Sequence, residues 1–408
     1  MKFVVPKAPI QNVKHVLQRV LNPSSRPIRV PIINLLRGGE RFIPSALYAK
    51  LTKAPLRPST PVIEGPHVSL LREYAAEGER LFEPGRFEQT GYYKNAAECI
   101  DLTGSYYLYV KNPNQICPVA KSFIDRFVKN KHIEYESDSG HSHANQRIIV
   151  RPIRHSDCYE VLDGNHRIAA AFIRGEREIC VLRRGDPVLT PVQDQLLNVM
   201  WQSGRVELYQ PVSLPETRKW KLVRKCSDRL EMMQVFLRSC GCTTGPYLDL
   251  GSSYGWFVSQ MRQFGMESTG VERDPMAIGV GEMIYGNKTG SVTRSDIVKY
   301  LREEKCSFDV TSCFSVLHHF VLGRASIGAE ELIRLIDRIT RRVLFFDTGQ
   351  AHEEWFRQDL PEWNAEYTRN WLQKNTTFSK VIPLGTDSDA MPPYEKNYRR
   401  TMFVCYRE

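Results

Sequence analysis

One short stretch, Asp163-Gly164-Asn165-His166-Arg167, combines an acid, a glycine, an amide, a histidine and an arginine. The residues before it, "CYEVL", have the pattern of a strand, and those after it, "IAAAF", continue as a helix of small residues. Such a turn presents backbone N–H groups and a cation to an anion at a helix N-terminus. The stretch therefore predicts an anion-binding turn.

A second chemical signature, of a different kind, lies in the C-terminal half. In "YLDLGSSYGWF" a predicted strand ends at Asp249, and a polar turn then leads through Gly251 and Ser252 to Gly255, which opens a helix. Glycines at these points allow the backbone to come close to a ligand at the carboxyl end of the strand. The stretch is typical of a nucleoside pocket.

Three further predicted strands end at the same edge with residues that suit such a ligand. "STGVERD" places Glu272 where an acid can hold a ribose diol, and "RSDI" places Asp296 where a side chain can accept from an adenine amino group. "FDVTSCFSVLHHF" brings Phe314 to the strand end that lines the reaction centre, followed by His318 and His319. We expect these residues to surround one ligand, because the carboxyl ends of parallel strands share an edge.

This region, from about residue 226 to residue 408, resembles the class I S-adenosylmethionine-dependent methyltransferases. The resemblance implies a Rossmann-like, doubly wound α/β sheet, S-adenosylmethionine as cofactor, and "FFDTGQ" as the end of the fifth strand. The cofactor contacts that it implies are Asp249, Gly251, Ser252, Gly255, Glu272, Asp296 and Phe314. The substrate-side residues that it implies are His318 and His319, with His352, Glu353 and Glu354 after the fifth strand.

Two alternatives stay open for this half. The glycine turn has Ser252 and Ser253 where methyltransferases of this class often have a second glycine. The first alternative is a related sheet that binds NAD or another nucleotide through the same acid. The absence of a G-x-G-x-x-G fingerprint disfavours that alternative. His318 and His319 have a structural alternative, which is to cap the loop after the fourth strand.

The first stretch is similar to the ParB/sulfiredoxin-like fold, whose members carry a strand, a G-x-H-R-type turn and a helix. The resemblance spans about residues 90–190 and implies an α+β domain in which His166 and Arg167 meet the phosphate oxygens of ATP with Mg²⁺. Asn165 stands where sulfiredoxins have their catalytic cysteine, so the reductase branch is disfavoured.

The "DG" before the turn instead resembles a kinase-type branch of that fold. There Asp163 would activate a hydroxyl or organise Mg²⁺, and an upstream helical acid would assist; Asp125 is the candidate, with Glu134 and Glu136 in reserve. The alternative is a degenerate fold that binds without catalysis, in which Asp163 caps its turn.

These motifs divide the chain of 408 residues into four predicted parts. In the ParB/sulfiredoxin-like domain, "RIIVRPI", "CYEVL" and "REICVLRR" are expected strands, and after the linker strands alternate with helices as in a parallel sheet. The parts are a basic, proline-rich leader at 1–85, the ParB/sulfiredoxin-like domain at 86–204, a linker at 205–225 and the methyltransferase domain at 226–408.

Charge and composition narrow the protein class. Residues 1–66 hold 11 Lys or Arg against two acids. Such a leader could bind nucleic acid, an anionic membrane surface or a polyanionic substrate, or it could pack over its own domains.

No apolar run is long enough for a transmembrane helix, and the first residues do not have the pattern of an export signal. Ten cysteines without a CxxC pair indicate reduced thiols in a cytoplasmic protein. The loop histidines 141, 143 and 155 lack partners at metal-ligand spacing, so no metal site is expected.

The preferred hypothesis is a bifunctional transferase that modifies a hydroxylated acceptor such as a sugar or the end of a surface glycan. A nucleic-acid methyltransferase with a ParB-like binding module is the alternative. It is disfavoured because "FSVL" stands where adenine N6 enzymes carry N/D-P-P-Y/F, and because no Pro-Cys nucleophile pair occurs. A non-catalytic sensor of nucleotide and S-adenosylmethionine is a third hypothesis, and it predicts binding without turnover.

Overall fold

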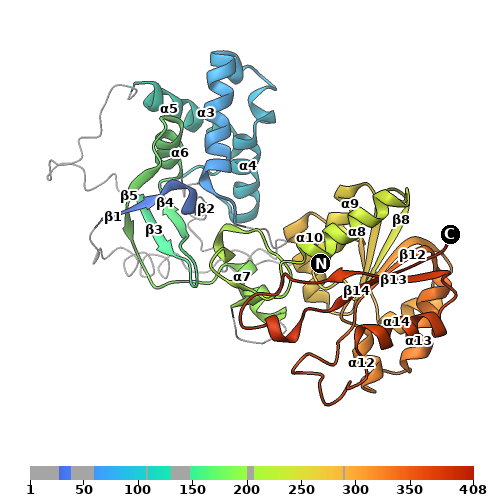
Figure 1. Ribbon diagram of the computed structural model, residues 1–408. Helices are drawn as coiled ribbons and strands as arrows, with labels where there is room; N and C mark the ends of the chain where they lie inside the picture. Colours follow the sequence, from blue (N-terminus) through green and yellow to red (C-terminus); the bar gives the residue numbers. More distant parts are fainter. Residues whose placement is uncertain (1–26, 38–58, 107–108, 130–147, 200–205, 288–289) are drawn as a thin grey trace, which may run out of the picture. The chain divides into compact units, whose positions relative to one another are not determined.

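The structure is a computed structural model that describes residues 27–37, 59–106, 109–129, 148–199, 206–287 and 290–408. The chain forms two compact units (Figure 1). Unit 1 comprises Met1–Asp194 and Leu214–Lys219, and unit 2 comprises Gln195–Ser213 and Trp220–Glu408. The segment predicted as a linker, 205–225, is therefore divided between the two units.

Unit 1 is built on a five-stranded mixed sheet. Its order is β1 (Ile28–Pro31), β5 (Glu178–Arg183), β3 (Ile148–Pro152), β4 (Tyr159–Asp163) and β2 (Leu35–Arg37). The strands β3, β4 and β5 are those predicted from the sequence, whereas β1 and β2 lie within the predicted leader. Because β2 and β4 run parallel, their carboxyl ends lie at the same edge of the sheet.

One helix of small residues packs against this sheet, and three further helices share a second core with it. The helices are α3 (Pro66–Glu77), α4 (Gly91–Thr103), α5 (Ile116–Lys129) and α6 (Asn165–Ile173), and α7 (Pro191–Val199) follows at the boundary of the unit. On α6, Ile168 and Ala171 belong to the sheet-side core, whereas Ala169 belongs to the core shared with the other helices. The small side chains of "IAAA" let α6 lie close to both layers.

Unit 2 is built on a seven-stranded sheet. Its order is β10 (Val292–Arg294), β9 (Glu267–Glu272), β8 (Pro246–Leu250), β11 (Phe308–Cys313), β12 (Thr340–Phe346), β14 (Thr401–Tyr406) and β13 (Lys380–Thr386). The five strands predicted in this half are β8 to β12, and they are parallel as expected. The strand β14 runs antiparallel to both of its neighbours, β12 and β13. The sequence order reverses at β8 and β11, which is where ligands bind in doubly wound sheets.

Alternating side chains along the strands feed two cores on opposite faces of this sheet. Phe345 faces one core with α8 (Ser227–Ser239) and α9 (Trp256–Phe264), whereas Leu344 and Phe346 face the other core. The sheet thus lies between two helical layers (Figure 1). The helices on the second face are α11 (Ile297–Glu303), α12 (Leu317–Val321), α13 (Ala329–Ile339) and α14 (Ala365–Asn375).

Two further features concern membrane-spanning helices and cysteines. Within the described residues, no helix is both long enough and apolar enough to cross a membrane. The ten cysteines are all free thiols.

Candidate active site

The turn after β8 brings the backbone of two segments into close contact. Gly251 and Gly255 have φ angles of 75° and 74°, in the left-handed region that favours glycine. A Cβ atom on Gly251 would lie 2.8 Å from Val316 Cγ2, on the segment after β11. Gly255 caps α9, so the unpaired N–H groups of that helix start at the carboxyl edge of the sheet.

Glu272, at the end of β9, lies against this turn because β8 and β9 are adjacent and parallel. Its Oε2 accepts from Ser253 N–H at 2.9 Å, and its Oε1 accepts from the N–H groups of Arg273 and Asp274 at 2.8 and 2.9 Å. These three bonds orient the carboxylate and leave acceptor capacity for a ligand hydroxyl. The predicted ribose-binding acid is thus held beside the predicted glycine turn.

Asp249, on the adjacent strand, is buried rather than presented at the surface. Its Oδ1 accepts from Ser312 Oγ at 2.6 Å, and Tyr247 in turn donates to Ser312 Oγ at 2.6 Å. Burial raises the pKa of Asp249 to about 7, against the opposing effects of the Ser312 bond and of Arg229. Asp249 is therefore partly protonated at neutral pH.

The remaining predicted cofactor residues have varied surroundings. Ser252 is fully buried, and its Oγ has no partner within the described part of the chain. Asp296 caps α11, because its Oδ1 accepts from the N–H groups of Val298 and Lys299. Phe314 is buried, and its ring lies 5.1 Å from that of Phe257 between centroids.

The two histidines after β11 differ in exposure. His318 is buried, its Nδ1 accepts from Gly349 N–H at 3.2 Å, and its ring packs against that of Phe356. Burial, followed by the nearby Arg400, lowers the pKa of His318 to about 2. His318 is therefore neutral, with its proton on Nε2. His319 is exposed at the surface, and partial desolvation of its ring, followed by the charge of Arg324, lowers its pKa.

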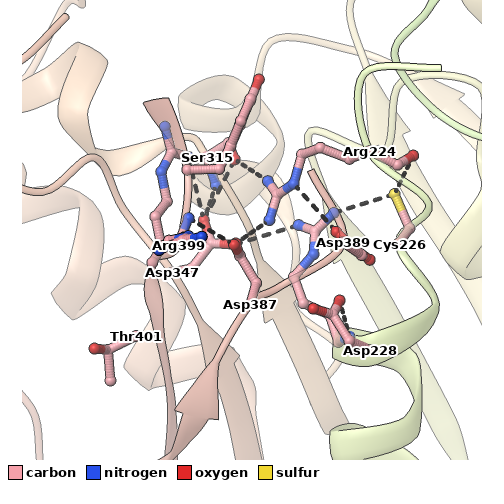
Figure 2. A network of polar contacts seen from close by, with 12 residues as sticks. Arg224, Cys226, Asp228, Ser315, Asp347, Asp387, Asp389, Arg399 and Thr401 are labelled. Atoms are coloured by element: carbon pink, nitrogen blue, oxygen red, sulfur yellow. Dashed lines mark hydrogen bonds and ion pairs between the residues drawn. The ribbon is translucent and has the colours of Figure 1, made fainter. Parts of the chain in front are cut away.

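A buried ionic network lies at the carboxyl ends of β11 and β12 (Figure 2). Arg224 donates through Nη2 to Asp387, and Arg229 Nη1 lies 3.3 Å from Asp347 Oδ2. Burial opposes the ionisation of Asp347, but the guanidinium groups of Arg229, Arg224 and Arg400 together lower its pKa. Asp347 follows β12 directly and Arg400 precedes β14, so the network joins the ends of neighbouring strands.

Ser315, the second residue after β11, contacts several of these groups. Its φ of 59° is unusual for a residue other than glycine. Its N–H donates to Asp347 Oδ1 at 2.7 Å, while its Oγ accepts from Arg400 Nη1 at 2.7 Å and from Arg224 Nη1 at 3.4 Å. Such contacts can hold a strained backbone, and strain of this kind clusters at functional sites.

The three acceptor-side residues after β12 are divided between this network and the surface. Glu353 is fully buried and makes two bonds to Arg400, at 2.8 and 2.9 Å. Glu354 is exposed and lies 3.7 Å from Lys396. His352 donates through Nε2 to the carbonyl of Tyr398 at 2.6 Å. Glu353 therefore supports the network instead of facing a substrate.

Sequence reasoning did not find Arg224, Arg229 or Arg400. Arg224 lies in the predicted linker and is fully buried, against the usual preference of arginine for the surface. The only signal for Asp347 was its position after a predicted strand, at "FFD".

The turn at residues 163–167 lies between β4 and α6, the strand and the helix that the sequence predicts on either side of it. Asp163 and Arg167 make an ion pair of 2.7 Å and are both partly exposed. Asn165 is 1% exposed, and both polar atoms of its amide lack a partner among the described residues. His166 shares a hydrogen bond of 2.9 Å with the Tyr92 hydroxyl.

The other predicted site residues of unit 1 lie outside this turn. Asp125 is exposed on α5. Arg37, which sequence reasoning missed, ends β2 at the same edge as the turn, and it donates to Asn95 Oδ1 at 2.6 Å. The reserve acids Glu134 and Glu136 and the histidines 141 and 143 lie outside the described residues. No metal-binding group of His, Cys, Asp or Glu occurs in the part of the chain that the structure describes.

A protein-family model matches part of unit 2. Residues 248–343 match the family model described as a methyltransferase domain. Unit 2 contains a methyltransferase domain. The match covers β8 to β12, and hence the glycine turn, Glu272 and the histidines after β11. No curated protein matches the chain in sequence.

Several solved structures resemble the chain at low sequence identity. One is the structure of WbdD at 2.2 Å, with 17% identity, a TM-score of 0.41, and coverage of 52% of this chain and 46% of that chain. Another WbdD structure is described as a bifunctional kinase-methyltransferase. The N-methyltransferase NodS from Bradyrhizobium japonicum WM9, solved with S-adenosyl-L-homocysteine, has 15% identity, a TM-score of 0.33, and coverage of 44% and 87%. The chain spans about half the length of the WbdD structures that it matches.

Proposed function

We propose that the chain is an S-adenosylmethionine-dependent methyltransferase whose cofactor lies over the carboxyl ends of β8 and β9. The observation that carries the proposal is the position of the Glu272 carboxylate. Three backbone N–H groups hold it beside the glycine turn of the methyltransferase domain. The buried, unpartnered Ser252 Oγ in that turn also suits a polar ligand.

Each of these residues has a distinct part in holding the cofactor. Glu272 accepts from the ribose hydroxyls, and the free N–H groups at the start of α9 attract the carboxylate of the amino-acid end. Asp296 has a second carboxylate oxygen for the adenine amino group, because its Oδ1 is occupied by the cap of α11. When bound there, S-adenosylmethionine supplies an electrophilic methyl group on its sulfonium sulfur. The chain's task is then mainly to align the acceptor.

For the acceptor we propose a hydroxylated molecule, such as a sugar or the end of a glycan. His318 supports this choice, because a neutral imidazole with Nδ1 occupied can donate from Nε2 to an acceptor oxygen. Arg224 and Arg400 already face Asp387 and Glu353, so their charges are balanced within the protein. The arrangement favours an uncharged acceptor over an anionic one.

For unit 1 we propose that the turn at residues 163–167 binds ATP with Mg²⁺ and transfers a phosphoryl group to the same kind of acceptor. The buried, unpartnered amide of Asn165 at the start of α6 supports a polar ligand there. Arg167 would meet phosphate oxygens, and Asp163 would organise Mg²⁺ or the attacking hydroxyl.

Calorimetric titration of the full chain with S-adenosylmethionine and with ATP–Mg²⁺ tests both parts. Glu272→Ala is expected to weaken S-adenosylmethionine binding about 10- to 100-fold, because it removes charge-assisted bonds to ribose. Arg167→Ala is expected to weaken only ATP binding. Matched controls are Glu267→Ala, exposed at the start of β9, and Arg174→Ala, at the end of α6; both are expected to leave binding unchanged.

The pattern of results separates the two halves of the proposal. Wild-type protein that binds no S-adenosylmethionine would refute the methyltransferase assignment. Protein that binds S-adenosylmethionine but no nucleotide would reduce unit 1 to a recognition domain.

A further inference from the structure

Part of the segment predicted as a linker lies against the glycine turn after β8. Residues 206–213 precede the matched methyltransferase domain but belong to unit 2. Within this segment, Gln210 is buried, and its Nε2 donates to the carbonyl oxygen of Ser252 at 3.3 Å. The side chain therefore reaches the middle of the glycine turn from outside the Rossmann-like sheet.

Neighbouring residues hold this segment in place on both sides of Gln210. The Tyr394 hydroxyl donates to Glu207 Oε2 at 2.6 Å, and Glu207 is itself buried. The Tyr285 hydroxyl, at the end of α10 (Pro275–Tyr285), donates to the carbonyl of Pro211. Gln210 is thus fixed at a defined position and does not lie on a free linker.

Only one of the two polar atoms of the Gln210 amide, Nε2, has a hydrogen-bond partner among the described residues. Its Oε1 is buried and has no hydrogen-bond partner among the described residues. A buried carbonyl oxygen without a donor is costly, so native proteins rarely leave one unpaired unless a ligand or water fills the place. Ser252, whose backbone Gln210 contacts, has a buried and unpartnered hydroxyl as well. Two unsatisfied groups therefore flank the same turn.

We propose that Gln210 binds the donor directly: Oε1 accepts a hydrogen bond from the ammonium group of its amino-acid end, while Nε2 holds the turn. The inference rests on the proposed methyltransferase function. The ammonium is assigned by elimination, because Glu272 suits the ribose and the start of α9 suits the carboxylate. An amide oxygen is an acceptor only, and the ammonium is the remaining strong donor of this ligand.

The test compares two ligands by calorimetry on the full chain. S-adenosylhomocysteine carries the ammonium group, whereas 5′-methylthioadenosine lacks the whole amino-acid end. Gln210→Met keeps the length of the side chain but removes the acceptor, and we expect about 10-fold weaker binding of S-adenosylhomocysteine. Binding of 5′-methylthioadenosine is expected to stay within twofold of wild type.

A matched control is Gln195→Met. The side-chain amide of Gln195 also donates to a backbone carbonyl, that of Met276 at 3.2 Å, but at an exposed position. This variant is expected to bind both ligands as wild type does. Thermal melting without ligand checks folding, and Gln210→Leu provides a second apolar variant if the first one melts early.

Three outcomes would overturn the inference in distinguishable ways. Unchanged S-adenosylhomocysteine binding in folded Gln210 variants would show that Oε1 meets no ligand. An equal loss for both ligands would place the contact on the nucleoside instead of the ammonium. Failure of the wild type to bind either ligand would refute the proposed function itself.

Discussion

Asp249 and Glu272 end adjacent strands, yet their surroundings give them different properties. Asp249 is buried with one side-chain donor, whereas three backbone N–H groups surround the Glu272 carboxylate. The buried acid therefore holds a proton near neutral pH, and the other is oriented for a ligand. Two carboxylic acids near the ends of neighbouring strands thus differ in surroundings: Asp249 is buried among side chains, and Glu272 is, as we propose, available for binding.

Asp249 makes a prediction about the pH dependence of stability. Its pKa in the folded protein, about 7, lies above the value of about 3.9 in an unfolded chain, so its contribution to stability is lost as the pH rises through 7. Asp249→Asn keeps the acceptor for Ser312 but cannot ionise. We expect its free energy of unfolding, relative to wild type, to rise by about 2–3 kcal/mol between pH 5 and pH 8.

Urea unfolding at the two pH values measures this difference. Asp359→Asn, at an exposed position in the same unit, is the control and is expected to show no such change. A constant difference between Asp249→Asn and wild type would mean that Asp249 is ionised throughout this range.

At the scale of elements, the ends of β11, β12 and β14 are joined by an ionic network in addition to apolar packing. Ser315 and Asp347 follow two parallel strands, and Arg400 precedes the antiparallel strand beside them. The backbone at this edge is therefore held by directional bonds. This is where we place the acceptor, and a rigid backbone there serves alignment.

The Arg400–Glu353 pair tests that interpretation. Both side chains are almost fully buried, so Arg400→Met or Glu353→Gln alone is expected to lower the free energy of unfolding by about 3–5 kcal/mol through an unpaired buried charge. The double variant is expected to lose less than the sum, and a double-mutant cycle in urea measures the coupling. The exposed pair Arg302–Glu331, expected to couple by at most about 1 kcal/mol, is the control. Equal coupling in the two pairs would contradict the role of burial.

At the scale of the whole molecule, each unit has its own sheet, its own core and its own candidate site. The methyltransferase domain lies in unit 2, and the predicted phosphate-binding turn lies in unit 1. This division into two units agrees with the two separate sites that we propose.

Calorimetric melting of the full chain provides the test at this scale. We expect two transitions, because two cores can unfold separately. S-adenosylhomocysteine at about 100 times its dissociation constant is expected to stabilise unit 2 by about 2.7 kcal/mol, and ATP–Mg²⁺ is expected to move only the other transition. If both ligands move the same transition, the assignment of one site to each unit is wrong.

The sequence alone predicted the features that depend on neighbours along the chain. The five parallel strands of unit 2 follow from alternating apolar runs, and Glu272 follows from its place at a strand end. The turn at Asp163–Arg167 was predicted for the same reason. In each case the local pattern and the direction of the strand are enough to place the residue.

Tertiary structure alone decided the rest. Prolines and basic charge favoured a leader, yet β1 and β2 join the sheet of unit 1. Gln210 and Arg224 were assigned to a linker, yet both are buried in unit 2. The partners of Arg224 at Ser315 and Asp387 lie far along the chain, and no local pattern relates them. Such contacts exist only once the order of the strands has brought distant segments together, because burial of a charge is tolerable only where its partner is already in place.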